Sequence, residues 1–104
     1  MTMDTPRFDS FEAFYPYYLA EHSNRTCRRL HFAGTTLVIV IAVIAALTAN
    51  AGWLWALPVA GYGFAWVGHF VFEKNRPATF KHPFYSLLGD FAMYRDIWLG
   101  RISL

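Results

Sequence analysis

Four histidines, His22, His31, His69 and His82, are the residues of this sequence best suited to chemistry. Neutral imidazole is the commonest metal ligand in proteins, so histidines that meet in space would form a metal site. Glu73 follows His69 by four residues, which places both on one helix face, where the carboxylate could bind the same metal or orient the imidazole. Imidazoles with one carboxylate suit Fe, Zn or Ni, so both O₂ chemistry at non-haem Fe(II) and hydrolysis at Zn²⁺ stay open.

Charged residues are few and unevenly distributed. They make up 15% of the chain, against roughly 25% in an average soluble domain. No Asp, Glu, Lys or Arg occurs from Leu30 through Phe72, a gap of 43 residues. Because about 20 apolar residues cross a bilayer core of ~30 Å, the gap holds two crossings. In the alternative, a soluble helical bundle, both helices would lack a polar face for water. The net charge of only +2 without a long basic run argues against nucleic-acid binding.

The elements that must position the histidines follow from this gap. Helical segments are expected at 8–22, 30–49, 53–73 and 83–99. The two central segments are the crossings, joined by a turn at Asn50-Ala51-Gly52, and Pro16 is expected to kink or restart the first segment. The outer two are amphipathic helices of the membrane interface. The sequence thus predicts an all-α membrane protein: a two-helix transmembrane hairpin with amphipathic N- and C-terminal helices, in a single integral-membrane domain, 1–104.

Basic residues flank the gap on both sides: Arg25, Arg28 and Arg29 before it, and Lys74, Arg76 and Lys81 after it. The turn between the two spans carries no charge, so the positive-inside rule places both ends of the hairpin, and both termini, in the cytoplasm. Arginines suit bidentate pairing with a carboxylate, which makes Arg25, Arg28, Arg29 and Arg76 candidates for binding an acidic substrate. A simpler role for each is topology and contact with lipid headgroups.

The histidines fall near one depth. His31 lies 20 residues before Ala51 and His69 lies 18 residues after it. At 1.5 Å per residue their depths differ by roughly 3 Å, which favours a shared site. His22 and His82 are each joined to the hairpin by a short connector that could fold back to the same surface. For any one histidine alone, a hydrogen-bonded interfacial side chain is the simpler interpretation, but polar groups at membrane depth are candidates for function.

Two motifs carry these histidines. The first is Glu21-His22-Ser23-Asn24 with His31 nine residues later, and the second is Gly68-His69-Phe70-Val71-Phe72-Glu73-Lys74-Asn75-Arg76-Pro77-Ala78. Together they resemble the 2-hydroxy fatty acid dioxygenase family, and the resemblance runs from Phe14 to Arg101, with a block from Thr79 to Met93 like that of the short bacterial branch. By position, the family's recurrent residues are matched by His22, His31, His69 and Glu73. His82 belongs to the bacterial branch. Arg25 and Cys27 depart from residues common in the family.

The resemblance implies Fe(II)-dependent oxidative shortening of a 2-hydroxy fatty acid by one carbon with O₂. The catalytic residues would be His22, His31, His69 and Glu73. The metal ligands would be His22, His31, His69 and His82. Arg25, Arg29 and Arg76 would assist in substrate binding. The expected partners are the fatty acid, O₂ and the lipid bilayer of a bacterial inner membrane, with a homo-oligomer left open.

Other classes of function remain open. Haem held between His31 and His69 would make the chain an electron carrier. Histidines that only form hydrogen bonds would make it a non-catalytic membrane scaffold, and Zn²⁺ at the same site would make it a hydrolase.

Overall fold

The computed structural model describes residues 8–104, and every regular element in that range is helical. In chain order these are α1 (Phe11–Ala20), α2 (Arg25–Thr48), η1 (Ala51–Trp55), α3 (Ala56–Val67), η2 (Gly68–Glu73), η3 (Ala78–Phe80) and α4 (Pro83–Trp98). The all-α prediction is confirmed for the described residues. Residues 1–7, which the expected domain 1–104 includes, lie outside them.

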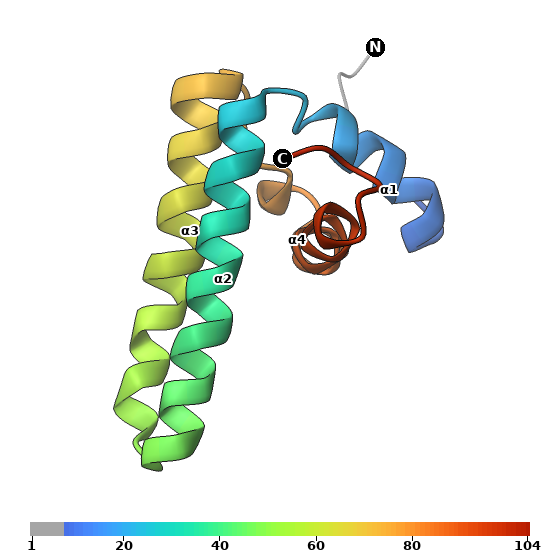
Figure 1. The fold of residues 1–104 in the computed structure, drawn as a ribbon. Helices are drawn as coiled ribbons and strands as arrows, with labels where there is room; N and C mark the ends of the chain where they lie inside the picture. Colours follow the sequence, from blue (N-terminus) through green and yellow to red (C-terminus); the bar gives the residue numbers. More distant parts are fainter. Residues whose placement is uncertain (1–7) are drawn as a thin grey trace.

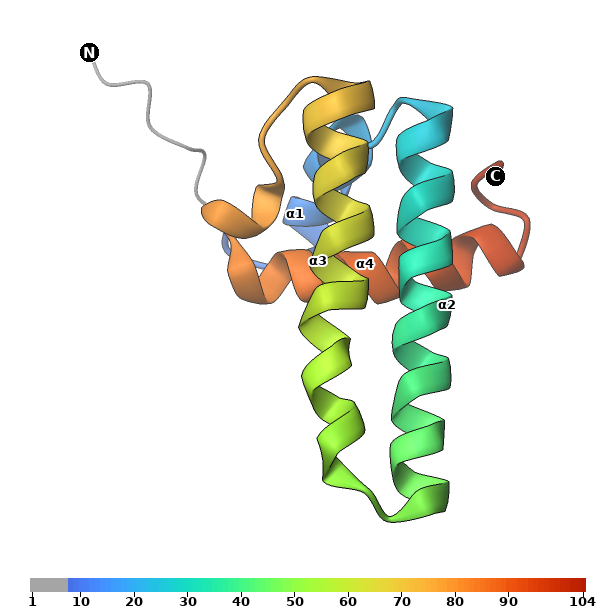
Figure 2. The same cartoon turned by 90° about the vertical axis from the view of Figure 1, so that its left-hand side faces the viewer.

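Two long apolar helical segments dominate the shape. α2 and the continuous run of η1, α3 and η2 lie side by side in opposite directions (Figures 1 and 2). Both Arg25–Thr48 and Ala51–Glu73 are long and apolar enough to cross a bilayer, and only 22% and 11% of their most apolar stretches are buried inside the molecule. A core helix of a soluble protein would be mostly buried, whereas exposed apolar helices suit lipid. Their passage through a membrane stays a prediction.

Local capping sets the ends of α2. The helix begins at Arg25 because the Asn24 side chain accepts a hydrogen bond from the Cys27 N–H at 3.1 Å, which caps the first turn. At the far end Ala49 takes left-handed backbone with φ 51°. The Asn50 side chain then accepts a hydrogen bond from the Gly52 N–H at 2.9 Å, so the chain reverses at the expected turn.

α4 crosses the side of the paired helices, and α1 packs against α4 (Figure 2). Phe14 and Tyr18 of α1 and Met93 of α4 form the centre of this packing, each at most 1% exposed. A Cβ on Gly89 would lie 2.7 Å from Cδ2 of Tyr18, so glycine at this position allows the Tyr18 ring to approach α4 this closely. Of the kink or restart predicted at Pro16, the restart does not occur: α1 runs through this exposed proline, with Phe14 and Tyr18 buried on either side of it.

α4 carries a stripe of large apolar side chains that lies outside the core. Phe84, Leu87, Leu88, Phe91 and Trp98 all remain exposed in the structure. The core side of α4 is made instead by small or polar residues and Met93. An exposed apolar stripe beside two exposed apolar helices is a surface suited to lipid, although an interfacial position for α4 stays a prediction.

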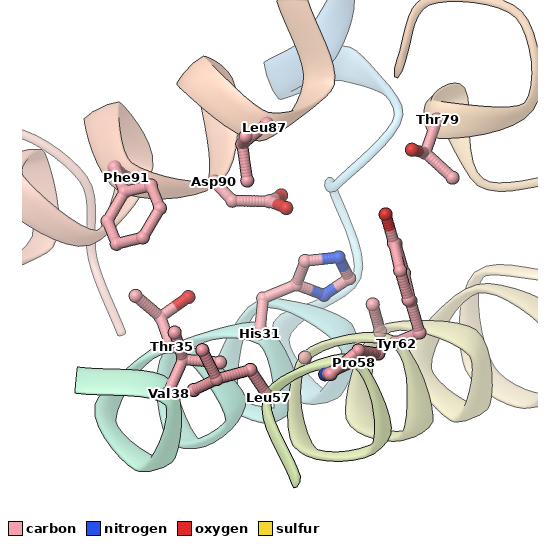
Figure 3. A pocket seen from close by; sticks show the side chains of 12 residues that line it. His31, Thr35, Val38, Leu57, Pro58, Tyr62, Thr79, Leu87, Asp90 and Phe91 are labelled. Carbon is pink, nitrogen blue, oxygen red and sulfur yellow. The ribbon is translucent and has the colours of Figure 1, made fainter. Parts of the chain in front are cut away.

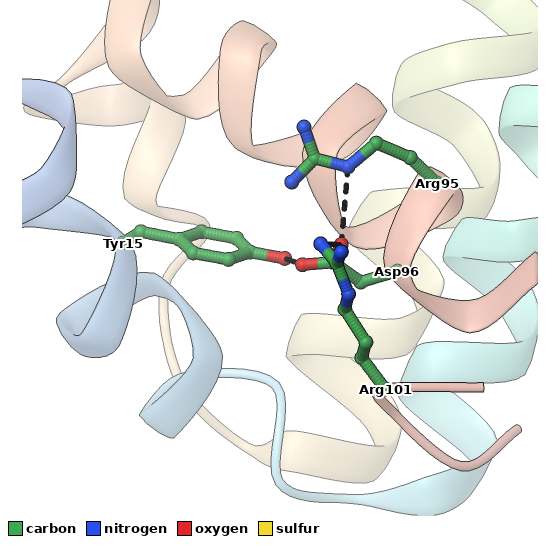
Figure 4. A network of polar contacts seen from close by, with 4 residues as sticks. All are labelled: Tyr15, Arg95, Asp96 and Arg101. Carbon is green, nitrogen blue, oxygen red and sulfur yellow. Dashed lines mark hydrogen bonds and ion pairs between the residues drawn. The ribbon is translucent and has the colours of Figure 1, made fainter. Parts of the chain in front are cut away.

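A polar network also joins α1 to α4. The Tyr15 hydroxyl donates a hydrogen bond to Oδ2 of Asp96 at 2.8 Å (Figure 4). The other carboxylate oxygen of Asp96 accepts from Arg95 at 3.0 Å and from Arg101 at 3.4 Å. The buried charge of Asp96 is therefore balanced by two guanidinium groups, and this side chain has a structural role at the helix junction.

Candidate metal centre

Three of the four histidines meet at one point. Nε2 of His22 lies 3.1 Å from Nε2 of His31 and 2.9 Å from Nε2 of His69. All three ligand atoms lie within 4.8 Å of one another, and each residue is buried, with 6% exposure at most. His31 comes from α2, His69 from η2, and His22 from the connector between α1 and α2. The chain thus brings together residues 47 positions apart in sequence.

Each imidazole is held by an oxygen on its far side. Nδ1 of His22 lies 2.6 Å from the Tyr18 carbonyl oxygen, and Nδ1 of His31 lies 3.0 Å from the Cys27 carbonyl oxygen. A carbonyl oxygen only accepts, so each Nδ1 carries the proton and each Nε2 presents a lone pair. Burial, together with the neighbouring His31 and His69, lowers the pKa of His22 well below its usual value, which keeps this ring in the neutral form that binds metal.

The imidazole of His69 is also held by an oxygen at Nδ1, in this case the side-chain oxygen of Asn75. Its Oδ1 accepts a hydrogen bond from Nδ1 of His69 at 2.7 Å. The amide orientation is set by Nδ2, which donates to the carbonyl and carboxylate oxygens of Glu21 at 3.2 and 3.3 Å. Lone pairs on three converging Nε2 atoms repel one another unless a cation lies between them. The donor set therefore fits a three-histidine metal site, with each ring oriented as metal-ligating histidines usually are.

The close approach of α2 and η2 depends on Gly68. A Cβ at this position would lie 3.0 Å from Sγ and 3.2 Å from Cα of Cys27. η2 is a π-helix, a wide turn often found at functional sites, and it turns His69 toward α2. Lys74 then takes left-handed backbone, with φ 59°, which reverses the chain and returns Asn75 to His69.

Among the described residues, Glu73 forms no hydrogen bond to any of the three clustered histidines, and its role as a metal ligand stays a prediction. Its carboxylate accepts hydrogen bonds from the Ser23 hydroxyl at 2.9 Å and the Asn24 N–H at 2.6 Å. These contacts fasten the connector that carries His22 to the end of η2. A carboxylate at this position also favours the helix that begins at Arg25, because it complements the positive N-terminal end of the helix dipole.

His82 lies apart from the other three histidines. Its ring packs edge-on against Phe8 and Phe14, with ring centroids 5.3 and 5.4 Å away, and it precedes α4. Its Nε2 is buried without a hydrogen-bond partner, but the residue is not part of the three-histidine cluster. The structure therefore does not bring together the four-histidine ligand set expected from the sequence, because the connector after η2 leads His82 into an aromatic cluster.

The arginines surround this end of the molecule without entering the site. Arg25, Arg29 and Arg76 are exposed, and none lines a described cavity. Arg28 donates hydrogen bonds to the carbonyl oxygens of His22 and Ser23 at 3.2 and 2.9 Å, so it helps to hold the connector in place. Substrate binding by the three exposed arginines stays a prediction.

Two adjoining cavities flank the histidines. A small one of about 20 Å³ is lined by the three histidines and, from α4, by Ser86 and Asp90. A larger one of about 280 Å³ lies between α2, α3 and α4, with mostly apolar walls (Figure 3). The two cavities share the side chains of His31, Tyr62, Ala65, Thr79 and Asp90. The three histidines therefore lie next to the larger, mostly apolar cavity.

Asp90 is a site residue that the sequence patterns did not indicate. The Tyr18 hydroxyl donates a hydrogen bond to its Oδ1, and the Tyr18 ring stacks on His22 with centroids 4.0 Å apart. Burial raises the pKa of Asp90 to about 6, although the hydrogen bond from Tyr18 acts in the opposite direction. Asp90 and Asn75 were missed because both are common surface residue types without a characteristic spacing.

Comparison with curated proteins and with solved structures yields no significant match in either set. Comparison with protein families does. From residue 8 to residue 102, the sequence matches the family described as "2-hydroxy-palmitic acid dioxygenase Mpo1-like". This range includes the three clustered histidines and every residue that holds them. On this match over most of its length, the chain belongs to the Mpo1-like family.

Proposed function

We propose that this chain is a membrane-embedded, Fe(II)-dependent dioxygenase that uses O₂ to shorten 2-hydroxy fatty acids by one carbon. One observation carries the proposal: three buried Nε2 atoms converge beside an apolar cavity, each with its lone pair directed inward by an oxygen at Nδ1. The description of the family as a 2-hydroxy-palmitic acid dioxygenase supports the reaction and the substrate class.

His22, His31 and His69 would hold the iron through Nε2. Fe(II) held there would supply the activation of O₂. The chain's own contribution is geometric. The carbonyls of Tyr18 and Cys27 and the amide of Asn75 hold the rings, and burial keeps bulk water out of the site.

The larger cavity suits the tail of the substrate. Its walls include Val38 and Leu57 from the paired helices and Leu87 and Phe91 from α4. Leu87 and Phe91 are also exposed on the outer surface, so the cavity adjoins the apolar face that would contact lipid. An acyl chain could therefore pass from the bilayer into the cavity, with its polar head toward the histidines.

Membrane placement follows from the same surfaces. The paired helices would lie in the bilayer and the apolar stripe of α4 in the interface, with the basic flanks and the histidine centre toward the cytoplasm. Exposed Arg25, Arg29 and Arg76 would attract the substrate carboxylate and anionic headgroups to this side.

Haem is disfavoured by the geometry. The rings of His31 and His69 lie only 4.9 Å apart, and the small cavity beside them has a volume of about 20 Å³, far too small for a porphyrin between the two rings. Zn²⁺ fits the same three nitrogens, so hydrolysis is the second candidate. The need for O₂ distinguishes these reactions.

The test uses detergent-purified protein reconstituted anaerobically with Fe(II). We expect about one metal ion per chain, retained in His82→Ala and lost in His69→Ala. With 2-hydroxypalmitate, mass spectrometry should detect the acid shortened by one carbon only after O₂ is admitted. Metal that survives His69→Ala would refute this site, and iron-loaded protein that forms no O₂-dependent product would refute the reaction.

A further inference from the structure

Two tyrosine–aspartate pairs join α1 to α4, and they differ in charge balance. Asp96 accepts from Tyr15 and is also paired with two arginines (Figure 4). Asp90 accepts from Tyr18, but within the described residues no cationic side chain lies at ion-pair distance from it. Its carboxylate instead points into the cavity, toward the ring of His31 (Figure 3). Asp90 is partly buried, and a partly desolvated carboxylate without a counter-charge is costly, so its position beside a cavity calls for a ligand.

The cavity wall has unused hydrogen-bonding capacity at this point. A carboxylate accepts about four hydrogen bonds, and among the described side chains only Tyr18 donates to Asp90. Ser86, one turn before Asp90, is 3% exposed, and its hydroxyl has no partner although it lines the small cavity. Buried polar groups are nearly always paired in native proteins. The small cavity beside the histidines is thus lined by an unpartnered hydroxyl, that of Ser86, and by the carboxylate of Asp90, which has a single donor, and together they indicate a polar ligand there.

We propose that Asp90 selects substrates with a hydroxyl group on C2, by accepting the hydrogen bond that this hydroxyl donates. The inference rests on the proposed function, and it adds the residue that distinguishes a 2-hydroxy acid from an unsubstituted one. Ser86 is the neighbouring donor and acceptor for the same polar head.

Charge decides whether the carboxylate or the C2 hydroxyl of the substrate faces Asp90. The substrate carboxylate has no proton to donate and is repelled by a second carboxylate, whereas the hydroxyl supplies the donor that Asp90 lacks. The hydroxyl therefore lies toward Asp90 and the carboxylate away from it. An unsubstituted acid leaves Oδ2 of Asp90 desolvated and without a donor, since Tyr18 donates only to Oδ1. For a hydrogen bond to a charged group, this loss corresponds to about tenfold weaker binding or more.

The test is equilibrium dialysis of labelled acids with the detergent-solubilised full chain under argon, both metal-free and loaded with Zn²⁺. We expect wild type to prefer 2-hydroxypalmitate over palmitate by about tenfold. Asp90→Asn should lower this ratio, because the amide oxygen still accepts from Tyr18 while the NH₂ group that faces the cavity cannot accept the hydrogen bond that the C2 hydroxyl donates. Asp96→Asn, the matched change in the other pair, should keep the preference.

A ligand-side arm needs no variant. 2-Fluoropalmitate places a small group on C2 that cannot donate, so wild type should bind it about as weakly as palmitate. Three outcomes would each overturn the inference. They are tight binding of 2-fluoropalmitate by wild type, an undiminished preference for 2-hydroxypalmitate in Asp90→Asn, and loss of bound metal in that variant. Hydroxyl selection without O₂-dependent product would refute the proposed reaction alone, whereas product with selection unaffected by Asp90→Asn would refute only the role of Asp90.

Discussion

Asn75→Ala tests how the centre is held together. This change removes the acceptor that lies 2.7 Å from Nδ1 of His69. Without it, the His69 proton can move to Nε2, the atom that would bind the metal, and the ring can rotate. His22 and His31 keep their backbone acceptors, so only one of three ligands is released. We therefore expect weakened metal binding with the protein still folded.

The size of the effect follows from this geometry. Loss of a group that orients a metal-ligating histidine typically weakens metal binding about 10–100-fold, or about 1.4–2.7 kcal/mol. Asn75→Asp keeps an acceptor for His69 and makes it anionic, so metal affinity should equal or exceed that of wild type. The same variant loses the donor to Glu21 and places two carboxylates together, because Nδ2 of Asn75 lies 3.3 Å from Oε1 of Glu21. Its metal-free stability should therefore fall.

The assay is competition for Zn²⁺ against a chromophoric chelator at pH 7.5, alongside SDS-induced unfolding of the metal-free protein. Asn24→Ala is the control, because it removes the cap of α2 at a cost of about 1 kcal/mol but leaves all three imidazole contacts in place. Wild-type affinity in Asn75→Ala would refute this reasoning. Equal weakening by Asn75→Asp and Asn75→Ala would refute it as well.

Three further predictions concern the packing and charges around the centre. Gly89→Ala places a Cβ 2.7 Å from the Tyr18 ring and should cost about 1–3 kcal/mol in SDS unfolding, whereas Gly63→Ala, with nothing within 4 Å, should cost nothing. Burial raises the pKa of Asp90 from 3.8 to about 6, so the metal-free wild-type protein loses stability as the pH rises from about 4 to about 6. Above pH 6, Asp90→Asn should therefore be more stable than wild type by about 3 kcal/mol. This difference in stability should fade toward pH 4, and a difference that does not depend on pH would contradict the assignment. Glu73→Ala should keep one metal ion per chain in elemental analysis while lowering stability, and loss of the metal would instead identify Glu73 as a ligand.

The spacing of His31 and His69 was predictable because helices are regular. Both lie on long apolar helices joined by a tight turn, and a helix carries residue spacing into distance along its axis. In the structure the centroids of the two rings lie 4.9 Å apart, in agreement with their similar distances from the turn. The lack of charge from residue 30 to residue 72 likewise indicated the two long helices directly.

The roles of His22 and His82 could not be separated in the same way. Each is joined to the hairpin by an irregular connector, whose path depends on contacts and not on periodicity. Glu73 and Arg28 hold the first connector so that His22 enters the cluster. Aromatic packing with Phe14 keeps His82 elsewhere.

The sequence by itself determined the helical class, the two long apolar helices, the similar distances of His31 and His69 from the turn, and the family. Only the tertiary structure decided which third histidine joins them, that Asn75 orients His69, and that Asp90 faces the cavity without a counter-charge. The physical reason is that composition and periodicity act along one helix. A site between helices is decided by side-chain contacts across loops and by close approaches such as that of Gly68 to Cys27.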